Sequence, residues 1–208
     1  RDNIMGLISN GTTIFDAGAL DSGLAKGAMT LIKKLTASSS ANLTFIHGTA
    51  DVVLDSTYKE YLFIVNNMHP GATSEVNFVF NMTTDGTNFN VSKQGTMMEN
   101  LHNENNSTSL LRYGPDPGDL ETGDFMLMGS INRDADGCGV CLFRLYNPAS
   151  TTFLKHYSAD IQLTHTGPRT YHRLAAGYAN TTSAITGVRF LMNTGNIDTG
   201  TITLYGIS

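Results

Sequence analysis

The segment 132–137 places oxygen-bearing side chains at alternate positions directly before a glycine. This spacing is typical of the first half of a calcium-binding loop, in which Asn132, Asp134 and Asp136 would supply the ligands. The second half of the pattern fails, because Phe143 stands where a bidentate glutamate should be. A polar β-turn is therefore the favoured interpretation. A calcium site is the alternative, and calcium is the one cofactor hypothesis that the sequence offers.

A second group of residues that could take part in catalysis is an acidic cluster. Its members are Asp116, Asp119, Glu121 and Asp124. Paired carboxylates act as acid and base in glycoside hydrolysis. Four carboxylates in a segment rich in proline and glycine are more often simply solvated. We therefore expect no enzyme activity, and a glycan depolymerase is the least favoured of the three functions considered.

The cysteines and histidines do not form a convincing metal site in the sequence. Cys138 and Cys141 lie three residues apart in a predicted strand, so they should face opposite sides of a sheet and remain ordinary thiols. His156, His165 and His172 allow a zinc trio. No histidine-glutamate motif accompanies them, and we expect surface or hydrogen-bonded histidines instead.

Sugar binding would need an aromatic platform, and tryptophan is absent from the chain. Tyr113, Tyr157, Tyr171 and Tyr178 are the candidates for that role. Packing within strands is the favoured interpretation of all four.

The composition favours strands and turns and argues against two classes of partner. Of the 208 residues, 40% are hydrophobic but only 15% are charged, and 21 are glycine. The net charge of −5 offers no basic surface for nucleic acid, and no apolar run is long enough to span a membrane. The chain begins with neither methionine nor a signal-peptide pattern, so we expect an ordered fragment or a processed product.

Hydrophobic periodicity predicts an all-β protein. Val76, Phe78, Phe80 and Met82 recur at every second position, which predicts a half-buried strand. Further strands are expected at 29–35, 41–47, 58–66, 89–93, 125–131, 138–146, 153–164, 171–178, 184–192 and 201–207. Turn residues separate them and no βαβ alternation occurs. The prediction is one antiparallel two-sheet β-sandwich over residues 28–208, of the jelly-roll type.

Two segments do not follow this pattern. Residues 1–27 alternate short apolar patches with turn signals and are predicted to form an extended N-terminal arm, with an ordinary strand of the sandwich as an equal alternative. Residues 94–124 lack periodicity and are predicted to be an exposed loop with one short helix near 109–112.

Several long blocks give the chain a family resemblance. They are residues 54–59, 68–70, 146–156, 175–185 and 194–207. Together they resemble a family of marine bacteriophage proteins of about 200 residues, often labelled tail fibre or hypothetical. The resemblance implies a virion structural protein and transfers no catalytic residue. The cysteines in segment 136–141 and the prolines in segment 115–118 depart from the family pattern.

The function expected from these observations is structural. The chain would be a non-catalytic virion protein, assembled in the host cytoplasm and placed on the particle exterior as a capsid decoration or tail-fibre component. Its partners would be copies of itself, most simply in a trimer, and other virion proteins. The alternative is a receptor-recognition module that binds a host surface glycan through the segment 94–124.

Overall fold

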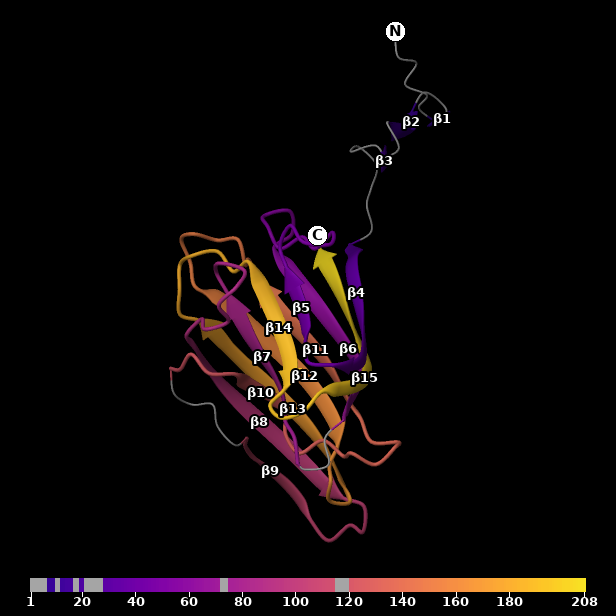
Figure 1. Ribbon diagram of the computed structural model, residues 1–208, viewed down its shortest axis with the longest axis vertical. Helices are drawn as coiled ribbons and strands as arrows, with labels where there is room; N and C mark the ends of the chain where they lie inside the picture. The colour runs from indigo at the N-terminus through magenta and orange to yellow at the C-terminus, as the bar shows by residue number, and fades with distance from the viewer. Residues whose placement is uncertain (1–6, 10–11, 17–18, 21–27, 72–74, 115–119) are drawn as a thin grey trace.

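The computed structural model describes residues 7–9, 12–16, 19–20, 28–71, 75–114 and 120–208, and within these ranges every regular element is a β-strand. Twelve antiparallel strands build two sheets that enclose one hydrophobic core, a sandwich-like all-β arrangement (Figure 1). No helix in the described ranges has the length and apolarity needed to cross a bilayer.

The two sheets differ in size. The smaller sheet has the order β10 (Phe125–Met128), β7 (Phe78–Thr83), β14 (Gly187–Met192) and β5 (Leu43–Ile46). The larger sheet has the order β4 (Met29–Ser40), β15 (Ile197–Ile207), β6 (Glu60–Pro70), β11 (Gly139–Tyr146), β12 (Lys155–Thr164), β13 (Arg169–Ala179), β8 (Lys93–Asn103) and β9 (Ser109–Tyr113). The larger sheet therefore extends beyond the smaller one, and β4 and β9 are its two edges.

The predicted arm at residues 1–27 is described only in part. Three short strands, β1 (Leu7–Ser9), β2 (Thr12–Asp16) and β3 (Ala19–Leu20), pair with one another as a small antiparallel sheet. The rest of this segment lies outside the described residues, so the extended arm stays a prediction.

Aromatic side chains from both sheets meet in the core. Phe80 of β7 lies 4.6 Å from Phe143, 5.1 Å from Tyr157 and 5.4 Å from Phe125, measured between ring centroids. All four rings are buried. Edge and tilted contacts of this kind add to the stabilisation from burial alone.

Three predictions about the strands are wrong. The strand β7 is buried on both faces, not one, because Asn81 also turns away from solvent and bonds to the segment before β10. The expected loop at 94–124 contains β8 and β9, and β9 replaces the short helix expected at 109–112. Residues 89–92 are not a strand, and β8 begins only at Lys93.

The part of the larger sheet formed by β13, β8 and β9 extends beyond the smaller sheet. Its inner face buries charged side chains at positions that are normally apolar. The carboxylate of Glu99 on β8 accepts hydrogen bonds from Arg112 Nε at 2.7 Å and from Arg173 Nε at 2.9 Å. Glu99 and Arg173 are buried, and Arg112 is half exposed. One carboxylate therefore joins three neighbouring strands, β13, β8 and β9, from the inner side.

A second buried charge joins the two sheets. Lys93 at the start of β8 donates from Nζ to Asn81 Oδ1 of β7 at 2.8 Å and to the carbonyls of Val91 and Gly123. Burial lowers the pKa of Lys93 to about 8, while the nearby carboxylates of Asp124 and Glu121 oppose that shift. This ammonium fixes β8 against the smaller sheet.

Candidate functional site

The outer face of the larger sheet, over β11, β12, β13 and β8, carries a shallow trough that runs across the strands. Its floor is a row of small side chains, because Ser158, Ala176 and Thr96 lie opposite one another in register on three adjacent strands. Small residues in one cross-strand row leave a depression wherever the neighbouring rows are large. We call this depression the trough.

One wall of the trough is aromatic. His156 pairs with Tyr178 in the next row of the sheet, and their rings contact each other edge to face at 6.2 Å between centroids. Tyr146 comes from the end of β11, and its hydroxyl lies 3.2 Å from Ser158 Oγ. Tyr178 Oη donates to Gln94 Oε1 at 2.8 Å. These hydrogen bonds restrain the two tyrosine rings at the rim.

The opposite wall is mainly aliphatic. Leu142, Asp160, Leu174 and Met98 form the next row of the sheet in register, and the row ends at Tyr113 of β9. The three apolar side chains of β11, β13 and β8 are all substantially exposed. Leu174 and Met98 are direct neighbours, whereas Asp160 separates Leu142 from them.

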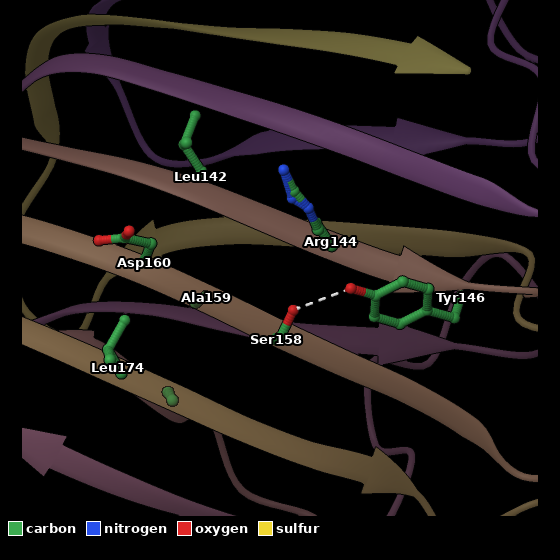
Figure 2. Close-up of a pocket in the computed structure, with 8 residues that line it drawn as sticks. Leu142, Arg144, Tyr146, Ser158, Ala159, Asp160 and Leu174 are labelled. Carbon is green, nitrogen blue, oxygen red and sulfur yellow. Dashed lines mark hydrogen bonds between the residues drawn. The ribbon is translucent and has the colours of Figure 1, made fainter. Parts of the chain in front are cut away.

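The trough consists of two hollows that meet at Tyr146 and Ser158. The first, of about 380 Å³, lies between Leu142, Asp160 and Leu174, and Figure 2 shows these side chains around it. The second, of about 510 Å³, is surrounded by the aromatic wall and the floor row. Volumes of this size match those of small-molecule binding sites.

The charges at the trough are compensated by partners on the same face. Arg144 Nε lies 3.1 Å from Glu60 Oε1, and His172 Nε2 lies 2.9 Å from Asp160 Oδ1. In the larger hollow, none of the described residues that surround it is an aspartate, glutamate, lysine or arginine. The trough thus offers hydroxyl, amide and ring groups rather than a strong field of one sign.

Beneath the floor the sheet has unusually close packing. Gly95 and Gly177 are opposite each other, and a Cβ on Gly177 would lie 2.4 Å from the Tyr157 hydroxyl. The absence of side chains at these two positions lets the Tyr157 ring lie directly under the backbone, where its hydroxyl donates to the carbonyl of Gln94 at 3.1 Å. Burial raises the pKa of the Tyr157 hydroxyl.

The edge strand β9 is a second unusual surface. All five of its residues are exposed, and among them Leu111 and Tyr113 expose 70% and 82% of their surface. No strand pairs with its outer side in the part of the chain that the structure describes. An apolar edge strand with free backbone groups is a template for pairing with another chain.

The segment predicted as a calcium loop forms a turn between β10 and β11. Asn132 Oδ1 accepts the backbone N–H of Asp134 at 3.0 Å, and the N–H of Gly137 bonds to the carbonyl of Asp134 at 2.7 Å. Asp134 and Asp136 are exposed. Among the described residues no group of three or more histidine, cysteine, aspartate or glutamate side chains is arranged to hold a metal. The calcium hypothesis stays a prediction.

Only two members of the predicted acidic cluster, Glu121 and Asp124, lie within the described residues. Asp116 and Asp119 lie outside the described residues. The backbone of Glu121 pairs with that of Lys93, while Asp124 Oδ1 accepts a hydrogen bond from Asn81 Nδ2 at 3.0 Å. The described acidic residues therefore help to join β8 to the smaller sheet.

The cysteines and histidines lie at separate places. Cys141 is buried, Cys138 is partly exposed, and both are free thiols. His156 and His172 lie on the outer face, whereas His165 follows β12 and accepts the N–H of Gly167 at 2.8 Å.

The tyrosines divide into two groups. Tyr157 and Tyr171 are buried, as packing within strands predicts, while Tyr113 and Tyr178 reach the outer face. Sequence reasoning considered His156 only as a zinc ligand or a surface histidine, and it missed Tyr146 and the floor row. The signal that would have found them is register, because only the pairing of β11, β12, β13 and β8 brings these residues into neighbouring rows.

Comparison of the chain with protein-family models, with curated proteins and with solved structures finds no match.

Proposed function

We propose that the protein is a non-catalytic structural protein of a bacteriophage virion that acts by assembly of identical subunits. The observation that carries the assembly proposal is β9, the edge strand on which Leu111 and Tyr113 are largely exposed. Exposed apolar side chains and unpaired backbone groups on one strand favour addition of another strand.

The opposite edge of the same sheet supplies a suitable partner surface. On β4, Leu31 exposes 60% of its surface and Met29 exposes 44%. Because β9 and the first residues of β4 both expose apolar side chains, β9 of one subunit can pair with β4 of the next. Such a head-to-tail contact generates a closed ring if the rotation fits. We propose that the ring is a trimer.

The proposed fold is a jelly roll whose larger sheet has been extended. Numbered one to eight along the chain, the strands β4, β5, β6, β7, β10, β11, β14 and β15 have the order 1-8-3-6 in one sheet and 2-7-4-5 in the other. This interleaving supports two Greek keys, as in jelly rolls, which occur in viral capsid and lectin domains. The hairpins β8–β9 and β12–β13 are then insertions that add four strands to the first sheet.

The virion assignment rests on the resemblance of blocks 146–156, 175–185 and 194–207 to marine phage structural proteins. Block 146–156 includes the end of β11 and the start of β12, at the centre of the larger sheet. Block 194–207 includes β15, which lies next to the edge strand β4. Labelling purified particles of the encoding phage with an antibody against this chain tests the assignment. Absence of the label from intact particles would overturn it.

Light scattering coupled to size-exclusion chromatography tests the assembly. We expect the wild-type chain to elute at three times the monomer mass, and the Leu111→Lys/Tyr113→Lys and Leu31→Lys variants to fail to form that species. The matched control is Phe153→Lys, because Phe153 is 68% exposed in the loop before β12 and away from both edge strands. A monomeric wild type at high concentration would contradict the proposal.

Mixing the two edge variants distinguishes a ring from a symmetric pair. In a head-to-tail assembly, one intact β9 and one intact β4 remain in the mixture, so a dimer should form while the ring cannot close. If Leu31→Lys leaves the oligomer unchanged, β9 pairs with another β9, and the trimeric ring is wrong.

A further inference from the structure

The trough has the chemical character of a sugar site, and this property is independent of subunit assembly. Tyr146, His156 and Tyr178 form one rim, and Ser158, Ala176 and Thr96 form the floor between that rim and Leu174. We propose that the trough binds a neutral saccharide, with a pyranose ring lying over the floor row and its C–H face against the tyrosine rings.

The aromatic wall supplies the apolar part of the recognition. The face of an aromatic ring is electron-rich, so it attracts the slightly positive C–H bonds that a pyranose presents on one side. Tyrosine provides this surface at low cost in conformational entropy, and its hydroxyl serves the polar edge of the same ligand. Tyr146 and Tyr178 are both partly exposed at the rim, which leaves ring surface available.

The polar part of the recognition comes from groups with unused hydrogen-bonding capacity. The Tyr146 and Ser158 hydroxyls share one hydrogen bond, and each oxygen keeps a further acceptor site. The ring nitrogens of His156 make no hydrogen bond within the described residues, although its ring contacts Tyr178. A ligand rich in hydroxyls can both donate to and accept from such groups.

The electrostatics of the trough favour a neutral ligand. Arg144 and Asp160 are the charged residues beside the floor. Arg144 is paired with Glu60 at 3.1 Å, and Asp160 is bonded to the His172 ring at 2.9 Å. Because Arg144 is already paired with Glu60, its guanidinium attracts an acidic sugar less strongly than an unpaired cation would. An uncharged pyranose needs no such exchange.

The site and the proposed assembly surface meet at one position only. The floor residue Thr96 pairs with Ala176, and the wall residue Met98 pairs with Tyr113 of β9, whereas Leu111 of β9 pairs with Asn100, one row beyond the wall. Substitutions at the floor and at Leu111 therefore report on different functions.

A direct test uses the full chain, labelled with ¹⁵N, titrated with methyl glycosides of glucose, galactose, mannose and N-acetylglucosamine, followed by a printed array of neutral and acidic glycans. We expect at least one neutral probe to shift the amide signals of Thr96, Ser158 and Ala176. Tyr178→Ala should weaken its binding by about tenfold. Tyr178→Phe should retain most of the affinity, because the ring is kept.

A floor substitution and a matched control complete the test. Ala176→Arg places a long side chain across an exposed position, so it should abolish binding without unfolding the protein, whereas Thr170→Arg on the same face of the same strand should leave binding intact. The single variant Leu111→Lys, which alters β9 outside the trough, should still bind, which separates the two proposals.

Three outcomes would overturn the saccharide proposal. The first is that no neutral glycan shifts the trough signals, and the second is that acidic glycans or proline-rich peptides bind there instead. The third is that Ala176→Arg dissociates the oligomer, which would make the trough a subunit interface.

Discussion

The aromatic core and the inner face of β8 and β13 bury different kinds of side chain. Between the sheets, Phe80, Phe143 and Tyr157 pack ring against ring with no charge among them. Along β8 and β13, Glu99 and Arg173 are buried just as deeply but are charged. The core depends on shape, whereas the extension depends on each charge keeping its partner.

This contrast predicts the largest loss of stability in the core. Phe80→Ala removes a ring that contacts Phe125, Phe143 and Tyr157, and should lower the free energy of unfolding by about 3–5 kcal/mol. Urea denaturation followed by tyrosine fluorescence measures the change. Phe153→Ala is the control and should have little effect, since that ring is exposed. Equal effects of the two substitutions would refute the assigned core.

Removing the buried carboxylate should cost somewhat less, but it can be compensated. Glu99→Gln leaves Arg173 buried without an anion but keeps an oxygen that can accept its hydrogen bond, so it should lower stability by about 2–3 kcal/mol. The double variant Glu99→Leu/Arg173→Leu replaces the pair by apolar groups and should recover much of that loss. A double variant that is less stable than the single one would show that the ion pair itself stabilises the extension.

The smallest expected effect is a dependence on pH at Lys93. Its pKa is lowered to about 8 in the folded protein, so between about pH 8 and 10 the unfolded chain binds more protons than the folded chain. Stability of the wild type relative to Lys93→Met should therefore rise with pH in this window, by at most about 1.4 kcal/mol per pH unit. Urea unfolding of both proteins at pH 7.5, 8.5 and 9.5 measures it. Parallel pH profiles would mean that Lys93 keeps its charge.

The sequence predicted the fold class because apolar alternation is a local signal. Phe78, Phe80 and Met82 on β7 and Val76 just before it are all buried, as their spacing predicts. The same reasoning failed for β8, where Glu99 occupies an inward position that should be apolar. Its partner Arg173 is 74 residues away in the chain, so no local pattern can show that this carboxylate is neutralised.

The candidate site was less predictable than the fold. Strand β9 is exposed on both faces and therefore has no hydrophobic period, which is why its segment was predicted to be a helix in a loop. The trough depends on cross-strand register, since Thr96, Ser158 and Ala176 are individually unremarkable small residues. Of the four tyrosines singled out in the sequence, only Tyr178 lines its rim.

Only the backbone of the sheet separates the floor of the trough from the core. The floor side chains themselves contribute little to the stability of the fold. Beneath it, Gly95 and Gly177 cannot accept even a methyl group without colliding with Tyr157. Above it, Thr96 and Ala176 point into solvent. Mutation can therefore alter the chemistry of this surface while the protein beneath stays unchanged, so we expect related chains to vary at Thr96 and Ala176 and to keep the two glycines.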